Sequence, residues 1–311
     1  SVQSLIKRLN EHFLIAGVIA VIITFIIIIF LSKAITRPLI EMKEATSLIS
    51  KGKFSVRLPK VGNDELGDLA KSIKSLADEL NYLTQERSDF LASISHELRT
   101  PLTYIKGYTD IVLKRDLKSE EQENYLKIIY EETIHLSELI KDLFDLAKID
   151  KNSFVIQKKS IRLDEILNRI QIKLAPAFLE KDMELEIICS KDLTIMADPI
   201  RLEQIILNLL DNSIKYSFKG GKTVLTAVKK KHDTVITIKD NGKGIPENDL
   251  PYIFNRFYRV EKARTRALGG TGLGLAIVKE LVHAHGGTIS VQSKENEGAE
   301  FEIMFKGDDN Q

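Results

Sequence analysis

Cysteine is almost absent from the sequence, because Cys189 is the only one in 311 residues. A single cysteine excludes an internal disulfide and any metal site built from several thiolates. The sequence also lacks an excess of charge of either sign: it has 45 Lys and Arg and 44 Asp and Glu, which leaves a formal net charge of +1. This balance provides no electrostatic argument for nucleic acid as a partner, and we expect none.

Residues 13–31 lack charge altogether and read FLIAGVIAVIITFIIIIFL. As a helix they would be about 28 Å long, close to the roughly 30 Å of a bilayer core. The run is longer than the core of a signal peptide, and apolar residues on every face argue against a buried helix of a soluble protein. We therefore predict a transmembrane helix in contact with the lipid bilayer.

Positive charge is distributed unevenly around this apolar run. Seven Lys or Arg residues follow it within residues 33–60, whereas two precede it. The positive-inside rule then predicts a cell-membrane protein whose C-terminal part is cytoplasmic, with residues 1–12 as the extracytoplasmic flank. The chain begins at Ser1 rather than at a methionine. We expect it to belong to a longer protein.

Two helices joined by a connector are predicted beyond the span. Pro38 should interrupt the first helical run and begin a new helix, and Gly52 marks the connector. The second helix carries apolar residues spaced alternately by three and four, the pattern of a coiled-coil seam, which favours a parallel dimer. Beyond Arg87 the spacing changes to four, which resembles a stutter. The seam residues are Leu66, Leu69, Ile73, Leu76, Leu80 and Leu83.

The same helix continues through SHELRTPLT at residues 95–103. A lone histidine on a helix is most often an ordinary surface residue. Glu97, however, could hydrogen-bond one ring nitrogen of His96 and leave the other free to attack. Pro101 cannot donate to the carbonyl of Glu97 and should kink the helix one turn beyond the histidine. A kinked helix with His96 and Thr100 on its outer stripe indicates a functional site.

From residue 151 the sequence changes to alternating strands and helices, which predicts an α/β sandwich. Before this change, a second amphipathic helix is expected over residues 119–148, with Leu126, Ile140 and Ala147 on its apolar face. The predicted strands are 154–161, 183–188, 193–197, 224–229, 234–239, 288–293 and 300–305, and the predicted helices are 163–180, 199–216 and 273–285.

The helix at 199–216 combines an apolar side with a polar stripe. Asp198 and Pro199 are expected to cap and begin it. An ordinary amphipathic helix would explain the pattern alone. Two asparagines one turn apart are nevertheless poor helix formers, and with a lysine one turn further they suit a hydrated Mg²⁺ and its phosphates. The polar stripe consists of Arg201, Gln204, Asn208, Asn212 and Lys215.

Two glycine-containing loops follow. Asp240 ends a strand before Gly242 and Gly244, and its carboxylate could accept a hydrogen bond from an adenine amino group. The loop at 269–274 begins the last helix, where backbone N–H groups favour phosphate. Each loop alone is weak evidence. The loop at 269–274 has the spacing G-x-G-x-G, which differs from that of the Rossmann motif. A separate segment resembles the end of a P-loop, but Tyr216 stands where the P-loop motif requires glycine.

Together these segments resemble a sensor histidine kinase of a two-component system. Residues 32–84 resemble a HAMP linker, 85–150 a dimerisation and phosphotransfer domain, and 151–307 an ATP-binding domain of the GHKL (Bergerat) type, followed by a tail at 308–311. The resemblance implies a multi-domain fold: a transmembrane helix, a parallel coiled-coil HAMP, a dimeric four-helix bundle and an α/β sandwich.

The resemblance also assigns roles to residues. SHELRTPLT is similar to the phosphoacceptor box, so His96 would be phosphorylated, Glu97 would be its general base, and Thr100 would position water when the protein dephosphorylates its partner. Asn208 and Asn212 would hold Mg²⁺, and residues 259–271 would form a mobile lid over ATP. The other implied ATP-binding residues are Lys215, Tyr216, Asp240, Gly242, Gly244, Phe254, Phe257, Arg259, Gly270, Thr271, Gly272, Leu273 and Gly274.

The implied function is autophosphorylation of His96 from ATP, followed by transfer to an aspartate of a cytoplasmic response regulator, in a homodimer. A GHKL-type ATPase or chaperone is one alternative, which the His96–Glu97 pair argues against. A non-catalytic membrane receptor is another, which the intact nucleotide motifs argue against. The sequence leaves open the balance of kinase and phosphatase output, and whether the phosphoryl group passes within one subunit or across the dimer.

Overall fold

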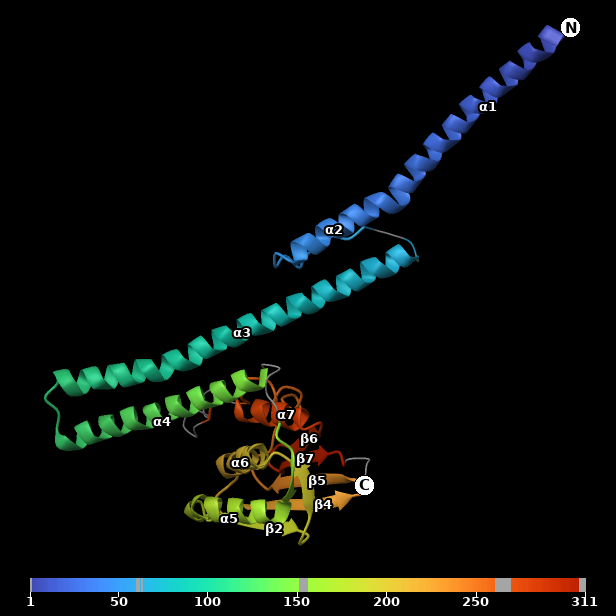
Figure 1. Ribbon diagram of the computed structural model, residues 1–311. Helices are drawn as coiled ribbons and strands as arrows, with labels where there is room; N and C mark the ends of the chain where they lie inside the picture. The colour runs from blue at the N-terminus through green and yellow to red at the C-terminus, as the bar shows by residue number, and fades with distance from the viewer. Residues whose placement is uncertain (1, 60–61, 63, 151–155, 261–269, 308–311) are drawn as a thin grey trace. The chain divides into compact units, whose positions relative to one another are not determined.

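The computed structural model describes residues 2–59, 62, 64–150, 156–260 and 270–307 (Figure 1). Two compact units make up the chain, residues 1–92 and 93–311. Helix α3 (Glu65–Lys114) contributes to both units, so the chain is helical across the predicted domain boundary at 84/85.

The first unit begins with α1 (Val2–Leu31), a π-helical turn (Ser32–Thr36) and α2 (Arg37–Ile49). Among the described residues this is the one helical run long and apolar enough to cross a membrane. Pro38 begins a new helix as predicted, because it lies in the first turn of α2. The expected break is a π turn rather than a gap. Arg37 N–H bonds to the carbonyl of Ser32, five residues back, so the backbone stays helical up to the proline.

Within the same unit, α2 packs against the beginning of α3. Met42 and Ile49 from α2 form a buried cluster with Ala70, Ile73 and Ala77 from α3. The predicted seam divides into two sets. Ile73 is buried and Leu66 and Leu80 pack on this cluster, whereas Leu69, Leu76 and Leu83 stay 44%, 50% and 51% exposed in the single chain.

In the second unit α3 continues to Lys114 and turns back as α4 (Ser119–Asp150). Pro101 is buried inside the helix, which passes through it without ending. The apolar face predicted for the second helix stays largely outside the core, since Leu126 and Ile140 are exposed. Leu139 and Leu146 are fully buried instead, in the core that α4 shares with the α/β part.

The α/β part is built on a five-stranded sheet of order β2-β4-β5-β7-β6, with β2 parallel to β4 and the other pairs antiparallel. Along β7, Phe301, Ile303 and Phe305 are buried and alternate with partly exposed residues, because α5, α6 and α7 cover that face (Figure 1). The strands are β1 (Lys159–Arg162), β2 (Glu184–Cys189), β3 (Thr194–Ala197), β4 (Lys222–Lys230), β5 (Asp233–Asp240), β6 (Thr288–Lys294) and β7 (Gly298–Phe305), and the helices are α5 (Leu163–Glu180), α6 (Pro199–Tyr216) and α7 (Gly274–Ala284).

Helices α5 and α6 have the predicted bounds, and six of the seven strands lie within about two residues of the predicted ones. The strand predicted at 154–161 differs, because β1 spans only Lys159–Arg162. Its partner is the four-residue strand β3, and a ladder ends where its partner ends. Residues 154 and 155 lie outside the described part of the chain.

Candidate nucleotide and phosphoacceptor sites

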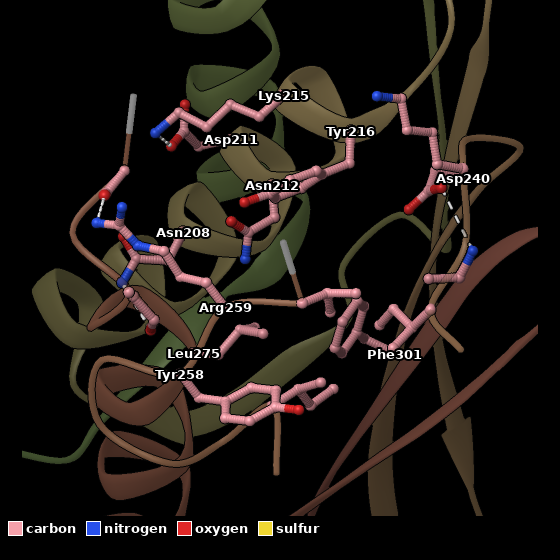
Figure 2. Close-up of a pocket in the computed structure, with 18 of the residues that line it drawn as sticks. Asn208, Asp211, Asn212, Lys215, Tyr216, Asp240, Tyr258, Arg259, Leu275 and Phe301 are labelled. Carbon is pink, nitrogen blue, oxygen red and sulfur yellow. Dashed lines mark hydrogen bonds and ion pairs between the residues drawn. The ribbon is translucent and has the colours of Figure 1, made fainter. Parts of the chain in front are cut away.

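Helix α6 is positioned by its first residues. The Asp198 carboxylate accepts hydrogen bonds from the N–H groups of Ile200 and Arg201, and Pro199 occupies the first turn, as predicted. The C-terminal half of the helix lines a cavity of about 1030 Å³ (Figure 2). The predicted residues that line it are Asn208, Asn212, Lys215, Tyr216, Asp240, Gly244, Arg259, Gly270, Thr271, Gly272 and Gly274.

The polar stripe of α6 places amide and ammonium groups along this cavity. Asn208 Nδ2 donates to the carbonyl of Gly274, 3.4 Å away. Lys215 Nζ lies 2.6 Å from the carboxylate of Asp211, one turn earlier. Figure 2 shows Asn212 between Asp240 on one side of the view and Arg259 on the other. Asp240 and Arg259 therefore lie on opposite sides of the cavity, with the amide of Asn212 between them.

Asp240 is the buried carboxylate of the site. Its Oδ1 accepts from the N–H groups of Gly242, at 2.9 Å, and Ala299, at 3.3 Å. Burial raises the pKa of Asp240, while these two N–H groups and the hydroxyl of Ser213 act to lower it. Since the N–H groups occupy Oδ1, Oδ2 is the better placed to accept from a ligand.

Gly242 does not line the cavity but shapes its wall from behind. A Cβ atom there would lie 2.7 Å from the carbonyl oxygen of Tyr216 and 2.8 Å from Cα of Ser217. The loop after β5 can therefore approach the end of α6 only with a glycine at this position. Asp240 is held beside α6 as a result.

The two predicted phenylalanines also lie behind the cavity. Phe254 packs edge-on against Phe301, with ring centroids 6.5 Å apart, and Phe301 lines the cavity. Phe257 N–H donates to the carbonyl of Gly272 at 2.9 Å. Gly272 has φ +70°, and a Cβ there would be 3.0 Å from Cα of Phe257. Both phenylalanines thus support the site rather than line it.

The glycine loop leads directly into α7. Leu273, its N-cap residue, provides no side-chain cap, but its N–H donates to the hydroxyl of Thr271 at 3.2 Å. Helix N-termini attract phosphate through free N–H groups and the helix dipole. Residues 261–269, most of the predicted lid, lie outside the described residues.

On α3 the side chain of His96 is exposed. The hydroxyl of Thr100 donates to the backbone carbonyl of His96 at 3.3 Å. Glu97 Oε2 lies 3.7 Å from a guanidinium nitrogen of Arg259, which is only 11% exposed. The carboxylate beside the histidine is therefore engaged by a residue of the nucleotide cavity.

Comparison with known proteins identifies the parts of the chain. Residues 30–82 match the HAMP domain, residues 86–152 the His Kinase A (phospho-acceptor) domain, and residues 197–309 the histidine kinase-, DNA gyrase B-, and HSP90-like ATPase. The signal transduction histidine-protein kinase ArlS of Staphylococcus aureus is 34% identical over 97% of this chain and 67% of its own length. The chain belongs to the sensor histidine kinases.

Other relatives agree with this assignment. The sensor histidine kinase YclK of Bacillus subtilis is 31% identical over 98% of this chain and 66% of YclK. The chain spans about two thirds of the length of these curated relatives. The crystal structure of the histidine kinase ThkA in complex with the response regulator TrrA matches with a TM-score of 0.60 at 22% identity, over 71% of this chain and 61% of that one, which shows a shared fold.

Membership of this family establishes that the chain is an ATP-dependent histidine kinase of two-component signal transduction. The predicted fold class and enzyme class are confirmed, as is the use of ATP. Membership in this family also decides against the chaperone-type ATPase and the non-catalytic receptor. The domain boundaries and the individual site residues stay predictions.

The kinase has further site residues that the sequence did not suggest. Glu138, Lys141 and Asp142 of α4 line the cavity. The hydroxyl of Thr271 donates to Asp142 Oδ2 at 2.6 Å. Burial raises the pKa of Asp142, and the bond from Thr271 acts against this. Thus α4 supplies part of the cavity wall beside the glycine loop that contains Thr271.

Asp145, one turn further along α4, engages the first half of the polar stripe on α6. Gln204 Nε2 donates to Asp145 Oδ2 at 2.9 Å, and Arg201 lies 3.5 Å from Asp145 Oδ1. Arg201 and Gln204 are therefore docking residues in this kinase, whereas Asn208, Asn212 and Lys215 line the cavity. Leu139 and Leu146, seven residues apart with both aspartates between them, are the sequence signal that could have indicated this face.

Proposed function

We propose that this kinase transfers the γ-phosphoryl group of ATP to His96 and then to an aspartate of a response regulator. The observation that carries the proposal is the order of groups along one cavity. A buried carboxylate that can accept from adenine lies at one side, and a glycine loop at the N-terminus of α7 lies with Arg259 at the other. The phosphoacceptor segment contacts this same cavity through Glu97 and Arg259.

Binding of ATP would use these groups in sequence. Asp240 Oδ2 would accept a hydrogen bond from the adenine amino group. Lys215 and the N–H groups that begin α7 would attract the phosphates. Because Lys215 now pairs with Asp211, the phosphates would compete with that carboxylate for the ammonium group.

The residues present fit a Mg²⁺ ion that arrives with the nucleotide. Within the described chain, no group of three or more His, Cys, Asp or Glu side chains could hold a metal. Mg²⁺ instead prefers few protein oxygens together with water and phosphate. Asn208 and Asn212, one turn apart on α6, would supply those oxygens. The ion would neutralise charge on the phosphates.

The chemical step would use His96 as the nucleophile. One ring nitrogen attacks the γ-phosphorus, the bond to the β–γ bridging oxygen breaks, and ADP leaves with that electron pair. Glu97 would hold the proton on the other ring nitrogen, which requires it to leave Arg259. The side chain of His96 is exposed, which leaves its ring accessible to an incoming phosphoryl group.

The proposal also includes a response regulator as the second phosphoryl acceptor, a homodimer and a membrane span. A response regulator would accept the phosphoryl group on a carboxylate, as the complex of ThkA with TrrA suggests for a related fold. A homodimer would cover the exposed seam leucines Leu69, Leu76 and Leu83. The apolar helix would span the bilayer with the kinase part in the cytoplasm. Thr100 would position water if the chain also dephosphorylates its regulator.

Labelling with γ-³²P ATP and Mg²⁺ tests this proposal. The chain should acquire label that survives base and is lost in acid, and His96→Gln should acquire none. His232→Gln, at an exposed turn between β4 and β5, is the matched control and should label normally. Added response regulator should remove the label from the chain. Label that persists in His96→Gln would place the phosphoacceptor elsewhere.

A further inference from the structure

The turn between β6 and β7 forms part of the wall of the nucleotide cavity. Glu295 and Asn296 of this turn line the cavity, as does Lys243 of the loop at 241–245 that follows Asp240. The N–H of Asn296 donates to the carbonyl of Lys243 at 2.6 Å. The turn and the loop therefore adjoin at the end of the cavity that contains Asp240.

Ser293, near the end of β6, joins the turn to this loop. Its hydroxyl oxygen accepts a hydrogen bond from the N–H of Ile245 at 2.8 Å, and its hydroxyl proton is donated to the carbonyl of Gly298 at 2.6 Å. A serine hydroxyl has one proton and two lone pairs, so both bonds can form at once. Ser293 does not line the cavity, so any effect that it has on a bound nucleotide is indirect.

The β7 side of the turn contacts Asp240 directly. The N–H of Ala299 donates to Asp240 Oδ1 at 3.3 Å. Gly298 has φ +87°, and a Cβ atom there would collide with the carbonyl oxygen of Asp240. Only glycine fits such a close approach. The position of the turn thus helps to fix the orientation of the Asp240 carboxylate.

We propose that Ser293 is a positioning residue for the recognition of adenine. The proposal rests on the proposed function, because it assumes that the cavity holds ATP with the adenine amino group at Asp240. Ser293 holds the loop that follows Asp240 through Ile245, and it holds the strand that contacts Asp240 through Gly298. The carboxylate is therefore in place before the nucleotide arrives.

Preorganisation of this kind raises affinity, because groups that are already ordered lose less conformational freedom when a ligand binds. Without the hydroxyl of Ser293, the N–H of Ile245 loses its partner. The loop then gains freedom that the binding of adenine must remove. This effect passes through Asp240, so it should disappear when Asp240 can no longer accept a hydrogen bond from the base.

Nucleotide affinity of the detergent-solubilised full chain measures the role of Ser293 without any phosphorylation. The probe is trinitrophenyl-ATP with Mg²⁺. Ser293→Ala should bind it about fivefold more weakly than the wild type, the effect of one lost hydrogen bond. Ser293→Thr keeps the hydroxyl and should restore most of the affinity. Ser290→Ala, the matched control, removes an exposed serine of the same strand and should bind normally. Wild-type affinity of Ser293→Ala would overturn the proposal.

A double-mutant cycle separates positioning from a general structural effect. Asp240→Asn replaces the carboxylate that accepts from adenine. Adding Ser293→Ala to Asp240→Asn should then weaken binding by less than about twofold, because residues that act through one another are not additive. A further loss of about fivefold in the double variant would show that Ser293 acts independently of Asp240, and would overturn the proposal.

Hydrogen exchange of the nucleotide-free wild type tests the same contact without any substitution. The amide of Ile245 should exchange slowly, because it is bonded to Ser293 before nucleotide is added. Exchange as fast as that of an unstructured peptide would show that the loop is not preorganised, and would overturn the proposal.

The two proposals fail differently in these titrations. Unchanged binding by Ser293→Ala, together with weaker binding by Asp240→Asn, would remove the positioning role alone. Unchanged binding by Asp240→Asn would remove the proposed contact of Asp240 with adenine, and with it the role of Ser293.

Discussion

The backbone N–H of Asp198 donates a hydrogen bond to Nε2 of His285, 3.1 Å away. Asp198 caps the start of α6 and His285 follows the end of α7, so this bond joins the two helices that frame the nucleotide cavity. Nδ1 of the same ring contacts the carbonyl of Leu281 at 2.7 Å. The ring must therefore be neutral, with its proton on Nδ1, and burial lowers the pKa of His285 accordingly.

Acid should destabilise the ATP-binding part through His285. Its folded pKa lies below the unfolded value of about 6.5, so the unfolded chain takes up the proton first. The stabilising contribution is complete above about pH 6.5 and is lost as the pH falls below it. Lys158, which donates to the carbonyl of His285, and Asp198 are the charged groups that face the ring.

Melting temperatures of the wild type and His285→Gln test this dependence. The variant should melt lower near neutral pH, because it loses a buried hydrogen-bond partner. The difference between the two chains should shrink between about pH 7.5 and about pH 5.5. A difference that stays constant over this range would show that the imidazole does not titrate as described.

Asp240→Asn should reduce ATP affinity by about tenfold or more, because hydrogen bonds to charged groups contribute about 1.5–3 kcal/mol. The amide can still accept from Gly242 at one oxygen, but its NH₂ group would face the adenine amino group. Asp233→Asn, at the other end of β5, is the matched control and should bind normally. Titration with trinitrophenyl-ATP measures both. Equal affinities of Asp240→Asn and the wild type for the nucleotide would mean that Asp240 does not bind the adenine base.

Leu76→Asp should convert a dimer to monomers in sedimentation analysis of the detergent-solubilised chain. Leu76 is 50% exposed in the single chain although it lies on the predicted seam, and a buried unpaired charge at a seam position is strongly unfavourable. Ser75→Asp adds the same charge one residue earlier, at another exposed position, and should leave the dimer intact. Dimers of equal stability in both variants would contradict the proposed interface.

The sequence predicted the parts of the site whose signals are local. Asp198 and Pro199 mark the start of α6, because capping depends on neighbouring residues. Asn208, Asn212 and Asp240 line one cavity as expected, since motif and cavity coincide there. Gly242 and Phe257 were assigned to the same pocket, yet they support it from behind, because a motif does not distinguish contact from support.

Local patterns in the sequence did not predict contacts between distant segments of the chain. The stripe on α6 looks uniform in sequence, but Arg201 and Gln204 meet α4 while Asn212 meets the cavity. Likewise the apolar positions of α4 form two faces, and periodicity alone does not say which partner covers each. Leu139 packs on the ATP-binding part, whereas Ile140 stays exposed in the single chain.

Placement of the phosphoryl group of ATP on His96 is the step on which the proposed function depends. The most direct test is peptide mapping by mass spectrometry of the intact chain after incubation with Mg-ATP, with digestion kept alkaline so that phosphohistidine survives. We expect one phosphorylated peptide, containing residues 95–99, with the phosphoryl group on the imidazole. A phosphoryl group on any other residue, with His96 unmodified, would contradict it.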